Sequence, residues 1–153
     1  MQIRNATQDD ISSIARMWHL GWHSAHAAIV DSDLVRLRNP ESFVARTTAH
    51  LPHVHVAEVA GEIVGFFILH EDELDQFYVD LAHHGRGFAQ AMMAQAEALL
   101  PPPTAWLACT VGNDRAAAFY RKCGWANTGE VVMEFETSEG PKPVNVWRFE
   151  KTL

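Results

Sequence analysis

The segment with the clearest chemical meaning is residues 84–89, which read His-Gly-Arg-Gly-Phe-Ala. It follows an apolar, strand-like run at residues 77–79 and precedes a stretch with the composition of a helix. Glycines at such a junction let the backbone approach a ligand closely, and the free amides at the start of a helix attract anions. The pattern therefore predicts a phosphate site. A glycine-rich connection without a ligand would have the same pattern, so this segment alone leaves that alternative open.

A second segment helps to decide between a phosphate site and a connection without a ligand. Residues 111–125 read VGNDRAAAFYRKCGW. Together the two segments resemble the signatures of the GNAT superfamily of N-acetyltransferases, which are Arg/Gln-x-x-Gly-x-Gly/Ala and, approximately, Asn-x-x-Ala-x-x-Phe-Tyr-x-Lys-x-Gly-Phe. Residues 84–89 meet the first signature in all but its opening position. The second signature is met by Asn113, Ala116, Phe119, Tyr120, Lys122, Gly124 and, in place of the final Phe, Trp125.

This resemblance implies that acetyl-coenzyme A (acetyl-CoA) is the cosubstrate, and that its acetyl group passes directly to a primary amine within a ternary complex. It also implies which residues bind the cosubstrate. Main-chain groups of Phe77, Tyr78 and Val79 would pair with the pantetheine arm, as an added strand pairs with a sheet edge. Asn113 would bond the same arm, unless it serves as the cap of the helix that follows. The pyrophosphate would be held by His84, Gly85, Arg86, Gly87, Phe88, Ala89 and Gln90.

The opening position of the first signature departs from the family pattern. The family has Arg or Gln where this chain has His84. An imidazole can still donate a hydrogen bond to phosphate, and it becomes a cation near pH 6.5. We therefore expect cosubstrate affinity to fall modestly as the pH rises from about 5.5 to 8.

Two residues are candidates for proton transfer. Tyr120 matches the family's general-acid tyrosine, which returns a proton to the departing thiolate; a role as a core aromatic beside Phe119 is the alternative. An amine of ordinary pKa about 10.4 must lose a proton before it attacks, so a base helps. Glu73 opens the strand before the glycine turn, where several family members place a catalytic glutamate. Asp75, on the same side of that strand, or a chain of waters could take its place.

The acceptor pocket is expected in the variable region, residues 18–52. By resemblance to the family, which builds this pocket from its first helices, we predict that Trp18, Trp22 and His23 bind the substrate. His19, His23 and His26 recur at helical spacing, but a zinc site needs further ligands and a closed geometry, so no metal is expected.

Two functions fit these motifs. The leading one is an N-acetyltransferase that acts on an amine of a small molecule or a peptide. The alternative is a catalytically silent module that binds acetyl-CoA as a sensor. Retention of Tyr120 and Asn113 favours the enzyme. The acceptor itself is not encoded in any motif of the sequence, and the resemblance leaves a homodimer open.

The elements that must position these residues follow from the spacing of apolar side chains and from turn residues. Strands are predicted at residues 3–6, 54–59, 62–69, 73–79, 106–111, 127–136 and 144–150. Helices are predicted between about residue 8 and residue 49, with breaks near Asp31 and at Asn39-Pro40, and then at 88–100 and 114–122. Consecutive hairpin strands exclude an all-parallel sheet. We therefore expect an α/β (α+β) fold, the GNAT fold, in which helices flank both faces of a central mixed, mostly antiparallel sheet, as one domain over residues 1–153.

Composition limits the partners and the location. The chain is 48% hydrophobic and 20% charged, which is typical of a globular protein. Its net charge of −7, with only 12 Lys and Arg, argues against nucleic-acid binding. The longest apolar run, residues 63–69, is far shorter than the roughly 20 residues of a membrane span, and residues 1–7 lack the apolar core of a secretory signal. We expect a cytoplasmic protein without a membrane partner, and with Cys109 and Cys123 reduced.

Overall fold

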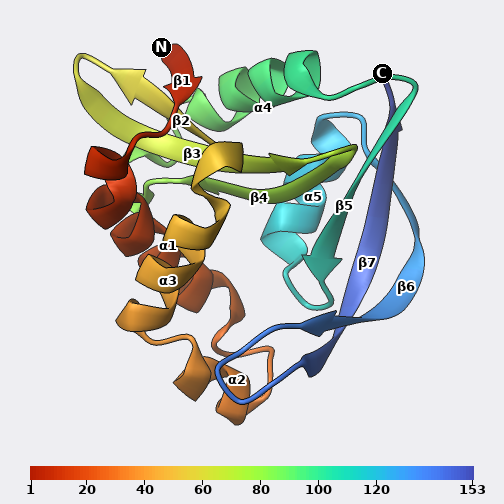
Figure 1. The fold of residues 1–153 in the computed structure, drawn as a ribbon. Helices are drawn as coiled ribbons and strands as arrows, with labels where there is room; N and C mark the ends of the chain where they lie inside the picture. Colours follow the sequence, from red (N-terminus) through yellow and green to blue (C-terminus); the bar gives the residue numbers. More distant parts are fainter.

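The computed structural model describes residues 1–153, which form a seven-stranded mixed sheet with helices on both faces (Figure 1). The strand order is β1-β2-β3-β4-β5-β7-β6. All neighbours are antiparallel except β4 and β5, which are parallel. The expected fold class is therefore confirmed. The strands are β1 (Gln2–Asn5), β2 (Val54–Val59), β3 (Glu62–His70), β4 (Glu73–Val79), β5 (Thr104–Thr110), β6 (Ala126–Phe135) and β7 (Lys142–Thr152).

Helices α2 (Ser32–Leu37) and α3 (Pro40–His50) begin where polar capping residues stand in the sequence. Asp31 accepts a hydrogen bond from the amide of Asp33, and Asn39 accepts one from the amide of Ser42, while Pro40 fixes the first turn of the next helix. The breaks predicted at these two places are therefore helix starts. The α-helices are α1 (Ile11–His26), α2 (Ser32–Leu37), α3 (Pro40–His50), α4 (Phe88–Leu99) and α5 (Asp114–Lys122), with short 3₁₀ turns at Gln8–Asp10, Leu51–His53 and Leu81–His83.

The sheet opens between its two parallel strands. Strands β4 and β5 are in register at one pair only, Glu73 and Trp106, near the start of each strand. The amide of Trp106 donates to the carbonyl oxygen of Asp72 at 3.1 Å. Beyond this point the strands diverge, and Figure 1 shows β5 running at a steep angle to β4. A wedge-shaped gap therefore separates the carboxyl-terminal halves of β4 and β5.

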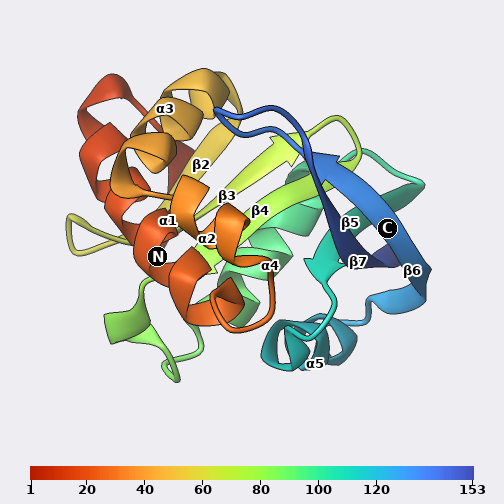
Figure 2. The ribbon, with the colours of Figure 1, turned by 90° about the horizontal axis from the view of Figure 1, so that it is seen from below.

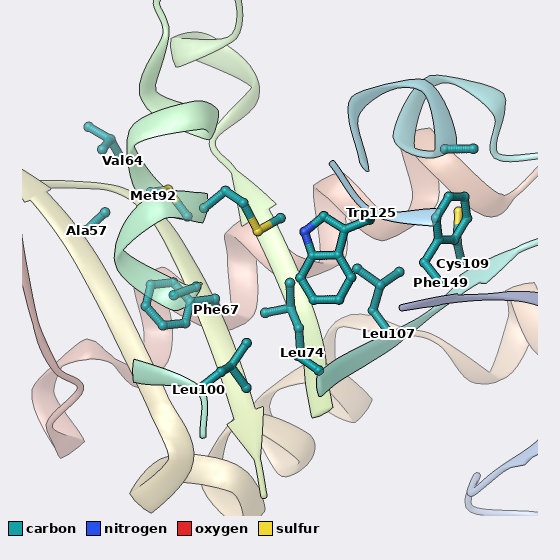
Figure 3. Close-up of a cluster of buried hydrophobic side chains, with 14 residues drawn as sticks. Ala57, Val64, Phe67, Leu74, Met92, Leu100, Leu107, Cys109, Trp125 and Phe149 are labelled. Carbon is teal, nitrogen blue, oxygen red and sulfur yellow. The ribbon is translucent and has the colours of Figure 1, made fainter. Parts of the chain in front are cut away.

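Two hydrophobic clusters hold the helices against the sheet. On one face, α4 and α5 pack over a cluster that includes Phe67, Met92, Leu107 and Trp125 (Figure 3). On the other face, α1, α2 and α3 cover a second cluster in which Trp18 is fully buried. Figure 1 shows α4 above strands β3 and β4, with α1 and α3 below them.

Strand β6 forms one edge of the sheet, and Figure 2 shows it on the side away from α1 and α3. Eight of its ten residues are exposed, the exceptions being Met133 and Phe135. Val131 is 45% exposed and Val132 is 63% exposed. The strand therefore presents both an apolar surface and a row of unpaired backbone groups to solvent.

Most boundaries fall within two residues of the sequence prediction, and β4 and α5 agree at both ends. Helix α4 ends at Leu99 rather than at Leu100, because the residue before a proline is driven to extended backbone and Leu100 has ψ 141°. Strand β7 begins two residues earlier and ends two residues later than predicted. Its pairing with β6 begins at Lys142 and its pairing with β5 extends to Thr152, so the two neighbouring strands set its length.

Candidate active site

The gap between β4 and β5 contains a cavity of about 570 Å³. Its walls come from elements that are far apart in the sequence: β4, the turn before α4, the end of β5 and the start of α5 on one side, and α1, α2 and α3 on the other. The cavity therefore brings together the two sequence motifs and the variable helices. Every residue that was predicted for catalysis, and most of those predicted for cosubstrate binding, line it; the exceptions are Arg86 and Gln90.

The glycine turn is shaped for an anion. Gly85 and Gly87 have φ values of 78° and 80°, which side-chain-bearing residues rarely adopt. Gly87 is the N-cap of α4, so no side chain occupies the end of the helix. The amides of the next three residues, Phe88, Ala89 and Gln90, donate to no carbonyl of the chain. These free amides at a helix start, beside the cavity, are what a pyrophosphate requires.

His84 has no ring nitrogen left for a phosphate. Its Nε2 lies 2.9 Å from the carbonyl oxygen of Val79, and its Nδ1 lies 3.0 Å from a guanidinium nitrogen of Arg115. A carbonyl only accepts and a guanidinium only donates, so Nε2 is the donor and Nδ1 the acceptor in this arrangement. The phosphate contact expected of His84 does not fit this arrangement, and the pH dependence expected from that contact stays a prediction. Arg115 is instead the cation beside the turn.

The open edge of β4 faces the cavity. The amide of Asp80 donates to the carbonyl of Val64 on β3, and Val79 is paired in register with Gly65. In an antiparallel pair this arrangement turns the amide and carbonyl of Val79, and those of Phe77 two residues earlier, away from β3. Strand β5 has already diverged at this level. Strand β4 therefore offers the amide and carbonyl of Phe77 and the amide of Val79 to a ligand in the gap, whereas the carbonyl of Val79 accepts from His84.

Helix α5 brings Asn113 and Tyr120 to the same cavity. Asn113 caps the helix, because its Oδ1 accepts from the amide of Ala116 at 3.4 Å. The Tyr120 ring packs against Phe119 and Phe149, with centroid separations of 5.8 and 5.7 Å. No hydrogen bond within the chain engages the Tyr120 hydroxyl. Burial raises the pKa of this phenol above its ordinary value, so the hydroxyl keeps its proton at neutral pH.

Glu73 lines the cavity from the first position of β4. Burial, with smaller contributions from the charges of Asp75 and Asp72, raises its pKa to about 7, although Arg148 acts in the opposite direction. A carboxyl group with this pKa changes its protonation state near neutral pH, which is the property of an efficient general base. Asp75 lines the same cavity, so the structure leaves both carboxylates as candidates.

The three residues predicted to bind the acceptor lie in different surroundings in the structure. The assignment of Trp18 is wrong: it is 0% exposed and packs against Phe43 and Phe66, so it belongs to the core. Trp22, one helical turn later, does line the cavity. His23 is not part of the cavity wall, and its Nε2 donates to the carbonyl of Arg38 at 2.6 Å.

Several wall residues were missed by sequence reasoning. They are Gly21 and His26 of α1, Arg38 after α2, Arg46 of α3 and Arg115 of α5. A Cβ atom at Gly21 would lie 2.7 Å from the Tyr78 ring, so glycine lets α1 approach β4 closely. That glycine sits inside a helical apolar pattern, which was the one available signal. The arginines had no comparable signal, since isolated basic residues are ordinarily solvated.

The three histidines of α1 do not converge. The Nδ1 of His26 is bonded to the carbonyl of Trp22, 2.9 Å away, and the ring of His19 packs against that of His23 with centroids 4.6 Å apart and an interplanar angle of 59°. No group of three or more His, Cys, Asp or Glu side chains forms a candidate metal site.

None of the helices combines the length and apolar character needed to cross a membrane. Both cysteines are free.

Comparison with known proteins places these features in context. Residues 14–125 match the family model described as the acetyltransferase (GNAT) family. A comparison with curated proteins gave no match.

Several solved structures share the fold across nearly the whole chain. A GCN5-related N-acetyltransferase from Rhodopseudomonas palustris is 19% identical, with a TM-score of 0.77 over 99% of this chain and 95% of that one. The apo form of YjaB from Escherichia coli is 19% identical, with a TM-score of 0.75 over 97% and 95% of the two chains. The PaiA N-acetyltransferase from Thermoplasma acidophilum, solved in complex with coenzyme A, is 16% identical, with a TM-score of 0.65 over 99% and 98%.

Proposed function

The chain belongs to the GNAT family of acetyltransferases, and from this premise we propose that it transfers the acetyl group of acetyl-CoA directly to a primary amine. The observation that carries the proposal is the cavity between β4 and β5. It joins the open edge of β4, the free amides at the start of α4, a protonated phenol and a carboxyl group of pKa about 7 in one space.

The proposed cosubstrate fits the donors on each wall. Phe77 and Val79 would pair with the amide groups of the pantetheine arm, and Asn113 would add a side-chain contact. The amides of residues 85–90 would hold the pyrophosphate, with Arg115 as a nearby counter-charge. These contacts would leave the thioester beside Tyr120 and Glu73, at the deeper end of the gap.

The chemistry then needs three proton transfers. Glu73 takes a proton from the acceptor ammonium, directly or through one water, and the neutral nitrogen attacks the acetyl carbonyl. A carbon–nitrogen bond forms and the carbon–sulfur bond breaks. Tyr120 gives its proton to the departing sulfur, so coenzyme A leaves as a thiol. The second proton of the amine then returns the tyrosine to its neutral state.

A protein that bound acetyl-CoA in the same cavity but transferred no acetyl group would be a sensor. The sensor function does not require a carboxyl group of raised pKa or an unengaged phenol beside the thioester, so these two groups favour the enzyme. Release of free thiol from acetyl-CoA in the presence of a broad set of primary amines tests the proposal. Binding without thiol release for every amine would establish the sensor instead.

We also propose a cytoplasmic location and an amine of a small molecule or a peptide as the acceptor. The two free cysteines are compatible with a reducing compartment.

Acetyl-CoA is expected to raise the thermal midpoint. A ligand at 100 times its Kd adds about 2.7 kcal/mol to the native state, or roughly 5 to 10 °C for a chain of this size. Gly87→Glu places a carboxylate at the start of α4 and should abolish this shift. Gly61→Glu is the matched control, because Gly61 has the same positive φ, 79°, in the turn between β2 and β3. An equal ligand-induced shift in both variants would contradict the phosphate site.

Hydrogen exchange should reveal which edge of β4 the ligand covers. On addition of acetyl-CoA, the amides of Phe77 and Val79 should exchange markedly more slowly, because they gain hydrogen-bond partners. The amide of Tyr78 is the internal control, since the register places it toward β3 with or without the ligand. Slower exchange at all three positions would indicate general tightening of the strand rather than pairing with the cosubstrate.

A further inference from the structure

The cavity wall formed by α2 and α3 contains two arginines that lack an acidic partner. Arg38 follows α2 and is 4% exposed, and Arg46 lies in α3. Both line the cavity. Neither takes part in any of the ion pairs of the chain. Arg46 is half-buried, with its Nη1 shielded from solvent. Arginine nitrogens shielded in this way are ordinarily paired, because the desolvation of a charge is costly.

Their hydrogen bonds are incomplete as well. Arg38 donates through Nη1 to the carbonyl of Glu136 at 3.0 Å, but its Nε is buried without a partner. The Nη1 of Arg46 is also buried without a partner, and its guanidinium carbon lies 4.2 Å from the centroid of the Trp18 ring. Stacking on an indole orients a guanidinium but supplies no acceptor oxygen. Each guanidinium group therefore has a buried N–H donor beside the cavity that no acceptor of the chain satisfies.

The surrounding charges leave this wall positive. Burial, and to a smaller extent the nearby charge of Arg38, lowers the pKa of Arg46 to about 9, whereas Tyr78 and Asp75 act in the opposite direction. Burial also lowers the pKa of Arg38. Asp75 is thus the carboxylate whose charge raises the pKa of Arg46, but the two side chains do not form an ion pair. A ligand that supplied an anion at this wall would relieve the mutual repulsion and the desolvation together.

We propose that Arg38 and Arg46 bind a carboxylate of the acceptor, so that the acceptor is a small molecule carrying both a primary amine and a carboxylate, of the amino-acid class. The proposal rests on the proposed function, because it identifies the acceptor of the same cavity. The planar guanidinium group matches a carboxylate in geometry as well as in charge. Glu73 and Asp75 on β4 provide the acidic wall toward which the ammonium group would point. One cavity with a basic and an acidic wall is complementary to a zwitterion.

The same arrangement selects against other amines. A polyamine has a second cation, which the two arginines would repel. A plain alkylamine, or an amino acid whose carboxylate is converted to an amide, leaves both guanidinium groups unpaired. Specificity here would thus come from the cost of unsatisfied buried charges as much as from attraction.

The first experiment compares acceptors at saturating acetyl-CoA. The twenty amino acids, their primary amides and spermidine are assayed for thiol release. For the best amino acid, kcat/KM is expected to exceed that of its amide by about 10- to 150-fold, the range for a hydrogen bond to a charged group. Amidation makes an amino group less basic and so more available at neutral pH, which means that reactivity alone would favour the amide. A preference for amides or for spermidine would overturn the proposal.

Variants assign the preference to the two arginines. Arg38→Met and Arg46→Met should raise KM for the amino acid, leave KM for the amide nearly unchanged and bring the ratio of the two specificities close to one. Arg46→Lys keeps the charge without the planar fork, and should recover part of the ratio even if Arg46→Met folds poorly. Arg16→Met on the exposed face of α1 is the matched control. An unchanged ratio in every arginine variant would overturn the assignment.

A binding experiment separates this inference from the catalytic proposal. N-acetyl amino acids and their amides are titrated into the protein with coenzyme A present, and heat is measured. Binding of the acid form that weakens at least 10-fold in Arg38→Met would support the carboxylate site even if no amine is acetylated, in which case the catalytic proposal alone fails. Acetylation that ignores the carboxylate, with equal binding of acid and amide, would leave an acetyltransferase and remove the carboxylate site.

Discussion

Tyr120→Phe is expected to lower the turnover number by roughly 100- to 10,000-fold, which is the usual contribution of a general acid. The substitution keeps the ring that packs between Phe119 and Phe149, so the fold and the affinity for acetyl-CoA should change little. Without the hydroxyl, the sulfur must leave as a thiolate in a poorly solvated site. Steady-state kinetics with one acceptor and a thermal-shift titration with acetyl-CoA measure the two effects separately.

The second tyrosine of the chain provides the control for this result. Tyr78 also lines the cavity, and burial raises the pKa of its phenol as well. Tyr78→Phe should retain turnover within a few-fold, because its ring is held between Gly21 and Phe66 rather than beside α5. If the large loss occurred in Tyr78→Phe and not in Tyr120→Phe, the acid would be Tyr78. Wild-type turnover in both variants would exclude a tyrosine acid.

Glu73→Gln is expected to lower turnover by roughly 100-fold or more at pH 7 and by much less at pH 9.5. For an amine of pKa about 10.4, roughly one molecule in 2,500 is neutral at pH 7 and about one in nine at pH 9.5, so the base has less to contribute at the higher pH. In the wild-type protein the rate should also rise through pH 7 as Glu73 ionises, and this inflection should vanish in the variant. Glu62→Gln at the exposed start of β3 is the control. An equal loss at both pH values would assign Glu73 a binding role, and Asp75→Asn would then be examined in the same way.

Stability gives an independent measure of the Glu73 pKa. The carboxyl group ionises at its ordinary value of 4.5 in the unfolded chain and at about 7 in the folded one. The folded state therefore loses stability relative to the unfolded state as the pH rises from about 4.5 through 7, and the loss is complete above that range. Glu73→Gln removes this loss. The difference in thermal midpoint between the variant and the wild type should thus be more favourable to the variant at pH 8 than at pH 5.

The fold could be predicted from sequence because local signals and global arrangement agree. Asn39-Pro40 starts a helix, Ala60-Gly61 makes a hairpin, and prolines after Leu100 end α4, each through backbone chemistry that needs no distant partner. The divergence of β4 from β5 was not predictable in this way. It depends on how two strands separated by a helix pair with each other, and the spacing of apolar residues along the sequence gives no information about that pairing.

Most residues that the two motifs suggest for the cosubstrate line the cavity, whereas the residues suggested for the acceptor mostly do not. Trp18 and Trp22 lie on one helical face, and only the three-dimensional packing shows that the first is in the core and the second at the cavity. Arg38 and Arg46 are separated by the start of a helix and carry no spacing signal. Their significance comes from guanidinium nitrogens that are buried without an acidic partner, a property that exists only in the folded chain.

The exposed edge at β6 bears on how the protein behaves when concentrated. A bare edge with Val131 and Val132 is a template on which another strand can assemble, and the acidic side chains of Glu130 and Glu134 stand along it. Like-charged edges repel each other, and the net charge of −7 adds to this repulsion. Electrolyte at 0.1 M screens exposed charges beyond about 10 Å. Crowded, salty solutions are therefore where colloidal stability would first be lost, and the loss would begin at this edge.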